Sequence, residues 1–143
     1  MDLKSQKGLT LTTVIVYIIG MVIVATIIGN ITIFFYNNIT SASSSARISV
    51  EHAKFNNFFI EETKKENNRI IKVESNKIQF ASGALFTYDD VNETIYRDNV
   101  KVCEYVSDFI LTYRPLETKG VIDIFIEIDG KPHTTSYVVG RGY

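Results

Sequence analysis

The feature that most constrains this sequence is a run over residues 8–46 that contains no Asp, Glu, Lys or Arg. Val, Ile, Leu and Phe dominate its part over residues 9–36, which as an α-helix would extend about 42 Å at about 1.5 Å per residue. The hydrocarbon layer of a bilayer is roughly 30 Å thick, and a secretory signal peptide has an apolar region of only about 7–15 residues. The sequence therefore predicts a retained transmembrane helix over residues 9–36 rather than a discarded signal peptide.

Charges on either side of this run orient the predicted helix. Lys4 and Lys7 precede it, and the next charged residue is Arg47. Because basic residues stay on the cytoplasmic side, we expect a cytoplasmic N-terminus and an extracytoplasmic C-terminal domain. The chain has 15 basic and 16 acidic residues, so its net charge indicates neither nucleic acid nor an anionic membrane surface, and nucleic-acid binding stays unknown.

Length and cysteine content limit what the rest of the chain can be. With 143 residues, the protein has room for one soluble domain and an appendage. Cys103 is the only cysteine, which excludes an internal disulfide framework and a four-thiolate zinc site. Since it follows Val102 in a strand-like run, we expect a buried, inert thiol, with a reactive thiol as the alternative.

Residues 37–66 are predicted to continue the helix with an amphipathic pattern. Residues 37–45 are rich in Asn, Ser, Thr and Ala and are compatible with a loop or with a polar stretch of the same helix. Beyond them a helical stripe is formed by Ile48, His52, Phe55 and Phe59. The opposite side carries Arg47, Glu51, Lys54, Glu61 and Lys65, and Glu61 and Lys65 have the spacing of an ion pair. We expect this helix to pack on its own domain rather than on a membrane, with His52 in the core.

From residue 67 onward the hydrophobic period changes from helical to alternating. Short strands are predicted over residues 70–74, 77–81, 84–88, 94–97, 100–106, 109–113, 122–128 and 134–139. The four isoleucines at Ile122, Ile124, Ile126 and Ile128 alternate with other residues, as in a strand with one face on a core. Asp129-Gly130 is a hairpin signal. The sequence thus predicts an α+β fold in which a long N-terminal helix packs on an antiparallel β-meander over residues 67–143.

The opening residues resemble a known processing motif. Lys7-Gly8-Leu9-Thr10-Leu11, after a short basic leader and before a long apolar helix, is similar to the N-terminal motif of type IV prepilins and pseudopilins. The resemblance implies a pilin-like fold and cleavage by a prepilin peptidase between Gly8 and Leu9. It also implies that residues 1–8 are a leader and that Leu9 becomes an N-methylated N-terminus. The bulky apolar Leu9 stands where the family usually has phenylalanine.

Thr13 departs from the family pattern in a way that narrows the expected role. The family usually has glutamate at this position, which pairs with the methylated amine of a neighbouring subunit during assembly. Thr13 brings no charge, so this ion pair in a low-dielectric setting would be lost. We therefore expect a minor pilin or pseudopilin of a type IV pilus, competence or type II secretion-like filament, because minor subunits are the family members most able to lack the glutamate.

The resemblance also implies partners and a location. The expected partners are other pilin or pseudopilin subunits, the prepilin peptidase, membrane lipid before assembly and, indirectly, an assembly platform with its ATPase. The chain would first be a single-pass cell-membrane protein and then part of a filament at the cell surface. The alternative is an unprocessed single-pass protein whose extracytoplasmic β-rich domain binds a partner. The filament system, the position in the filament and the bound target stay open.

No arrangement of residues in the sequence indicates catalysis. His52 and His133 have no Cys, Asp or Glu at metal-ligand spacing, and neither a nucleophile-elbow motif nor a Gly-rich phosphate loop is present. Asp89, Asp90 and Glu93 are compatible with a loose cation site but lack the order of a calcium loop, so turn formation is the preferred interpretation. We expect no enzyme activity, no metal and no cofactor. Strand tyrosines at positions 88, 96, 105, 113 and 137 are candidates for a binding surface or ordinary sheet residues.

Overall fold

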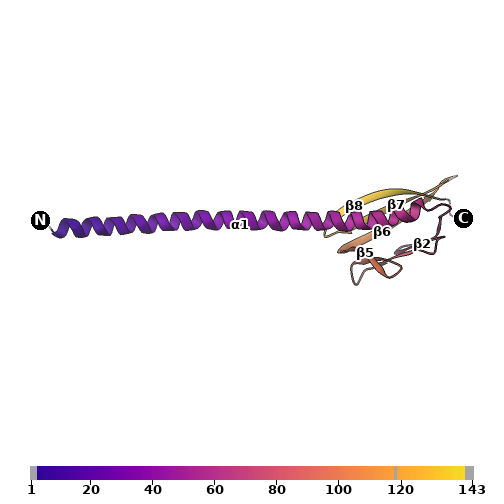
Figure 1. The fold of residues 1–143 in the computed structure, drawn as a ribbon, viewed down its shortest axis with the longest axis horizontal. Coiled ribbons are helices and arrows are strands. Elements are labelled where there is room, and N and C mark those ends of the chain that lie inside the picture. Colours follow the sequence, from indigo (N-terminus) through magenta and orange to yellow (C-terminus); the bar gives the residue numbers. More distant parts are fainter. Residues whose placement is uncertain (1–2, 118, 141–143) are drawn as a thin grey trace. The chain divides into compact units, whose positions relative to one another are not determined.

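The computed structural model describes the backbone of residues 3–117 and 119–140, and the side chains of residues 10–117 and 119–140. Within these described residues the chain forms one helix, α1 (Leu3–Lys64), followed by eight strands (Figure 1). Two compact units divide the chain, Met1–Ser44 and Ser45–Tyr143, and α1 contributes residues to both. We call them the N-terminal unit and the C-terminal unit.

The strands of the C-terminal unit form two antiparallel sheets in which sequence neighbours pair. The first sheet contains β1 (Ile70–Glu74), β2 (Lys77–Phe80), β3 (Leu85–Asp89), β4 (Thr94–Arg97) and β5 (Val100–Glu104) in that order. The second contains β6 (Val106–Pro115), β7 (Lys119–Ile128) and β8 (Lys131–Gly140) in that order. The predicted α+β class is confirmed, and each sheet is a meander.

The single strand predicted over residues 100–106 is wrong. Tyr105 has a left-handed backbone with φ of 64°, which ends β5 at Glu104 and lets β6 begin in the other sheet at Val106. The turn is held by backbone hydrogen bonds from Val106 N to Glu93 O at 2.8 Å and from Asp129 N to Tyr105 O at 3.0 Å. The predicted meander is therefore divided in two at this residue.

The helix is continuous where the sequence left a choice. Residues 37–45 are helical, so the segments predicted over residues 9–36 and 37–66 belong to one helix that ends at Lys64. In the turn that follows, Asn67 has a left-handed conformation with φ of 57°, and Asn68 N donates to Lys65 O at 3.1 Å. For residues 37–45, composition alone did not decide between helix and loop, because Asn, Ser and Thr are weak helix formers that also favour turns.

One hydrophobic core joins the last part of α1 to both sheets. Ile48, Phe55 and Phe59 are buried on the helix, which confirms three of the four predicted stripe residues, and His52 is half-buried. The Phe55 ring lies 6.1 Å from Phe86 of β3 and 6.3 Å from Phe109 of β6, so a single side chain contacts both sheets. The four alternating isoleucines of β7 are all buried, as predicted from their period.

Hairpin geometry agrees with the turn signals. Asp129 and Gly130 have φ of 50° and 73°, and the β7–β8 register pairs Ile128 with Lys131, so the predicted two-residue hairpin is confirmed. β8 runs beside α1 within the C-terminal unit and in the same direction, as Figure 1 shows. Tyr137 Oη donates to Asn56 Oδ1 at 2.6 Å, and its ring lies 4.5 Å from that of Phe59.

A buried carboxylate at the end of α1 was not predicted. The Glu62 side chain is 0% exposed, and its Oε1 accepts hydrogen bonds from Arg97 of β4 and from Lys65 Nζ. Its Oε2 accepts from Asn68 Nδ2 at 3.0 Å and Ser82 Oγ at 2.8 Å. Lys65 therefore pairs with Glu62, whereas the predicted pair of Glu61 with Lys65 is wrong: Glu61 instead contacts Arg97 at 3.3 Å. Glu62 is the more enclosed of the two carboxylates, so the lysine gains more by bonding to it.

Candidate functional site

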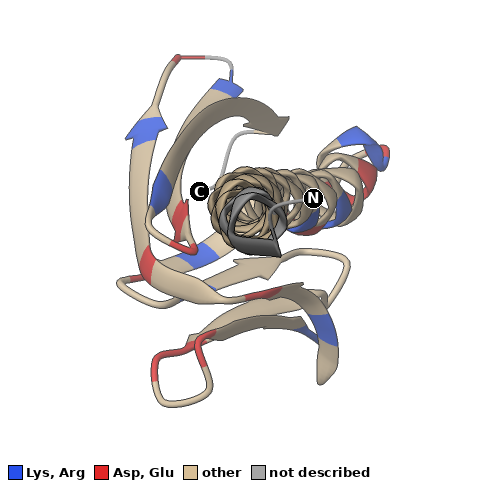
Figure 2. Cartoon of the chain, turned by 90° about the vertical axis from the view of Figure 1, so that its left-hand side faces the viewer, with Lys and Arg blue, Asp and Glu red and all other residues tan. Residues whose placement is uncertain are grey.

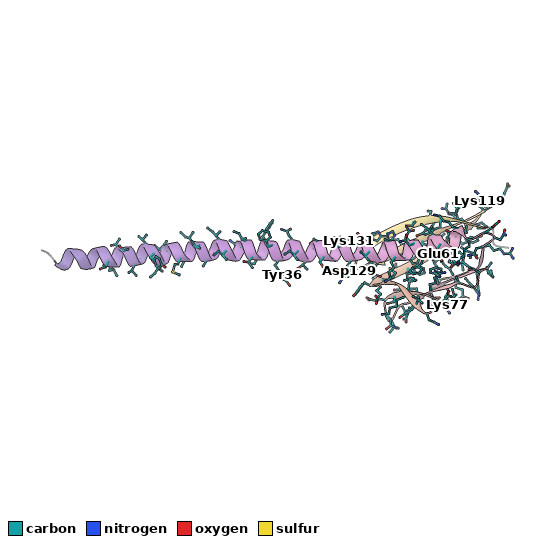
Figure 3. The ribbon with its side chains drawn as sticks, in the orientation of Figure 1. Tyr36, Glu61, Lys77, Lys119, Asp129 and Lys131 are labelled. Carbon is teal, nitrogen blue, oxygen red and sulfur yellow. The ribbon has the colours of Figure 1, made fainter. Side chains whose placement is uncertain are left out.

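The candidate site is the apolar part of α1. Over residues 10–64 this helix has a mean hydropathy of 2.6 in its most apolar window, and it is long and apolar enough to cross a membrane. Every residue from 10 to 43 is exposed, and Figure 3 shows the side chains of this stretch pointing outward all around the helix. A large apolar surface of this kind marks contact with lipid or with other protein chains.

Several threonines in this stretch donate their hydroxyl groups to the backbone of their own helix. Thr26 Oγ1 donates to Val22 O at 2.8 Å and Thr32 Oγ1 donates to Ile28 O at 2.8 Å. Thr40 Oγ1 makes the equivalent bond to Tyr36 O at 2.9 Å. Because each hydroxyl is bonded to its own helix one turn earlier, these threonines can face hydrocarbon at little cost.

Asn30 differs from these threonines. It is exposed, and its carboxamide makes no hydrogen bond to any other described residue. A carboxamide has two N–H donors and a carbonyl acceptor, so it gains more from a partner than a hydroxyl does. The sequence alone already favours packing of Asn30 against a partner helix over exposure to lipid, because its carboxamide lies within an apolar helix. The hydrogen bonds of Thr26 and Thr32 add that these neighbours need no such partner.

The residues of the predicted processing site lie at the start of α1. The backbone of Gly8 and Leu9 is helical, but their side chains lie outside the described residues. Thr13 is described, helical and exposed. The structure thus places the predicted cleavage and N-methylation positions, Gly8 and Leu9, on the same helix as Thr13, four to five residues before it.

The first charged residue after the apolar run is held by the C-terminal unit. Arg47 Nη2 donates to Asp129 Oδ2 at 2.6 Å, and the Arg47 guanidinium lies 4.5 Å from the centre of the Tyr105 ring. Lys131 Nζ donates to Ser45 Oγ at 3.1 Å, and Figure 3 shows Asp129 and Lys131 together at the β7–β8 turn. Sequence reasoning missed this clamp because its partners are more than 80 positions apart.

The two histidines meet in the C-terminal unit. The rings of His52 on α1 and His133 on β8 stack with centroids 4.5 Å apart. The pKa of His52 lies below its usual value mainly because the ring is partly buried and, to a smaller extent, because His133 is close to it. No group of three or more potential metal ligands occurs among the described residues, and stacked rings do not direct their nitrogens at one ion.

Other candidate residues have structural roles. Cys103 is fully buried, as predicted, and burial raises the pKa of its thiol to about 12. Asp89 accepts hydrogen bonds from Val91 N and Asn92 N at 3.1 and 3.2 Å, which supports the turn interpretation over a cation site. Charges of both signs are distributed over the strands (Figure 2).

The predicted tyrosines do not form one surface. Tyr137 is buried, Tyr88 donates its hydroxyl to Val106 O at 2.9 Å, and Tyr105 is exposed beneath Arg47. Two of the five, Tyr88 and Tyr96, line one open groove of about 770 Å³ on the first sheet, together with Asp98. Asp98 Oδ1 accepts from Leu85 N at 2.9 Å, so this carboxylate oxygen supports the sheet.

Comparison with models of protein families, with curated proteins and with solved structures found no match to this chain.

Proposed function

We propose that the protein is a minor type IV pilin or pseudopilin, a structural subunit of a type IV pilus, competence or type II secretion-like filament. The observation that carries the proposal is one continuous helix with two kinds of surface. Residues 10–43 are exposed and uncharged, whereas Ile48, Phe55 and Phe59 further along the same helix form the core of an antiparallel domain. A helix of this kind can exchange lipid for sister helices without unfolding the domain that it carries.

Removal of the leader has a physical consequence for this helix. Cleavage between Gly8 and Leu9 would remove every charged side chain before Arg47. The only charge left in the apolar part would be the new amine of Leu9. Moving a helix from lipid into a bundle of similar helices then requires no charged side chain to cross hydrocarbon, where each would cost several kcal/mol (about 2.5–3.5 on insertion scales). The prepilin peptidase would supply this cleavage, and a platform with its ATPase would supply the movement.

The proposed location follows from the same residues. Lys4 and Lys7 would hold the N-terminus in the cytoplasm until cleavage, and the C-terminal unit would lie outside the membrane. After assembly the unit would face the surface of the filament.

The first experiment determines the N-terminus of the native protein extracted from membranes, by intact mass and peptide sequencing. A chain that begins at N-methylated Leu9 is the expected result. Gly8→Val should leave the longer form, because a β-branched side chain would occupy the position before the cut. The matched control is Gly20→Val on the same helix, where a Cβ atom meets nothing within 4 Å. A native chain that keeps its leader would refute the proposal and favour an unprocessed single-pass binding protein.

The minor role is tested by abundance and by Thr13. In purified filaments we expect the protein at a small fraction of the main subunit. The wild-type protein should assemble with Thr13 in place, without needing the substitution Thr13→Glu. A filament built mainly of this protein would contradict the minor role while leaving the processing proposal intact.

A further inference from the structure

The exposed part of α1 carries a stripe with the spacing of a two-helix seam. The residues Val16, Ile19, Ile23, Thr26, Asn30, Ile33, Asn37 and Thr40 follow one another in steps of three and four, and all are exposed. Such steps keep residues on one side of a helix that pairs with another helix. We call this set the Asn30 seam. It lies entirely within the N-terminal unit.

Asn30 lies deep enough to need a partner. The middle of residues 9–36 falls between Val22 and Ile23, and at about 1.5 Å per residue Asn30 lies about 11 Å from it. Bilayer hydrocarbon reaches about 15 Å from its centre, so a centred helix places Asn30 inside it. An amide that enters hydrocarbon without a hydrogen-bond partner loses its hydration without compensation, so this arrangement is strongly disfavoured. Thr26 on the same seam avoids this cost through its bond to Val22 O.

A second copy of the chain is the partner that fits this group. Copies of a single-pass protein insert in the same orientation, so their Asn30 residues reach the same depth. A carboxamide both donates and accepts, so two of them can bond to each other. In the heptad defined by the seam, Asn30 and Asn37 occupy equivalent positions of the kind where asparagine sets register and favours two parallel strands. The β-branched Val16 and Ile23 occupy the two preceding positions of the same type.

We propose that α1 forms a parallel homodimer in the membrane, in which the Asn30 carboxamides of two copies hydrogen-bond to each other across the Asn30 seam. This dimer requires only that the helix spans the bilayer. It does not depend on cleavage at Gly8, so it extends beyond the proposed filament function, and it would exist in the membrane before any assembly.

Disulfide crosslinking in native membranes tests the seam. Cys103 can stay in place because it is fully buried. Ile23→Cys and Ile33→Cys lie on the seam, whereas Ile28→Cys, about 160° around the helix from Asn30 at about 100° per residue, is the matched control. We expect disulfide-linked dimers from the two seam variants and not from the control. Equal crosslinking at all three positions, or none at the seam, would overturn the proposal.

The role of the carboxamide is tested by the dissociation constant of the dimer. Sedimentation equilibrium of the full chain in density-matched detergent micelles should give a dissociation constant roughly 3- to 30-fold higher for Asn30→Leu, from an interhelical hydrogen bond of about 0.6–2 kcal/mol. Thr32→Val is the control, because Thr32 is off the seam and bonded to Ile28 O. An unchanged constant for Asn30→Leu, or a purely monomeric wild type, would overturn the proposal.

A Gly8→Val background separates the two proposals. If uncleaved protein still crosslinks at the seam, the dimer stands whether or not the filament function does. If only cleaved protein crosslinks, the dimer as proposed here is wrong.

Discussion

The buried carboxylate of Glu62 offers a sharp test of how the C-terminal unit is held together. Replacing it in Glu62→Gln keeps the size and shape of the side chain and removes its charge. One carboxylate oxygen then becomes an N–H donor. Since Lys65 Nζ, Arg97, Asn68 Nδ2 and Ser82 Oγ all donate to Glu62, the new donor faces at least one other donor whichever way the amide turns.

The expected loss follows from the burial of the two charges. Removing one partner of a buried ion pair costs about 3–5 kcal/mol when the other charge is left fully buried. Here Glu62 is 0% exposed and Arg97 is 17% exposed, so water can partly solvate the remaining guanidinium. We therefore expect Glu62→Gln to lower the free energy of unfolding by about 2–4 kcal/mol at neutral pH.

The pH dependence has a definite sign. Burial acts to raise the pKa of Glu62, but the hydrogen bonds from Lys65 and Ser82 and the charge of Arg97 outweigh it, so the pKa lies below its ordinary value of 4.5. On acidification the unfolded chain takes up this proton first. The stabilisation by the carboxylate is complete above pH 4.5 and is lost as the pH falls through the lower pKa of the folded state. Wild type and Glu62→Gln should therefore converge in stability below that range.

The neighbouring Glu61 provides the control. It contacts the same Arg97 at 3.3 Å but is 57% exposed, so Glu61→Gln should cost less than about 0.5 kcal/mol. Urea titration of the full chain in detergent micelles can be followed by the reaction of Cys103 with a thiol reagent, because this buried thiol becomes accessible only on unfolding. Equal losses for the two glutamine variants, or a loss at Glu62 that does not change with pH, would refute the reasoning.

Three further predictions concern the C-terminal unit. The free energy of unfolding should fall from about pH 7 to pH 5, because burial and, to a smaller extent, the nearby His133 lower the pKa of His52, so that the unfolded chain binds the proton first. His52→Phe should reduce this pH dependence in urea titrations, and an unchanged pH dependence would contradict the prediction. Gly120→Ala should cost about 1–3 kcal/mol because its Cβ would stand 2.5 Å from Tyr113 Oη, and a double-mutant cycle with Tyr113→Ala should show coupling rather than additivity. Native Cys103 should react with iodoacetamide at about pH 8 far more slowly than the urea-unfolded chain, since burial raises its pKa to about 12; equal rates would show that the thiol is accessible.

Most of the fold was predictable because the spacing of apolar residues within each element indicates whether it is a helix or a strand. The alternating isoleucines of β7 and the Asp129-Gly130 turn needed only neighbouring residues to be recognised. The break at Tyr105 was not predictable in this way, because a tyrosine gives no signal for a left-handed backbone. The hydrogen bonds that hold it there join residues that are 13 and 24 positions apart, Val106 with Glu93 and Asp129 with Tyr105.

Charged residues show the same limit of local reasoning. The i, i+4 rule assigned Lys65 to Glu61, but Lys65 bonds to Glu62, whose carboxylate is also bonded by Arg97 and Ser82 from other parts of the chain. The candidate site likewise has features that the sequence revealed and features that only the structure revealed. The apolar run and the preference of Asn30 for a partner helix were evident from the sequence, whereas the structure was needed to show which threonines bond to their own helix. The processing motif at Gly8 and Leu9 stays a prediction.

The alignment of β8 with α1 has a mechanical consequence. Ser45, His52 and Asn56 of the helix contact, in the same order, Lys131, His133 and Tyr137 of the strand. A force that pulls the helix lengthwise out of the C-terminal unit would load these contacts in shear and at the same time, instead of peeling them one by one. In single-molecule force spectroscopy such a joint should rupture in one step, and a stepwise release would contradict this geometry. The C-terminal unit could thus carry tension delivered through the helix.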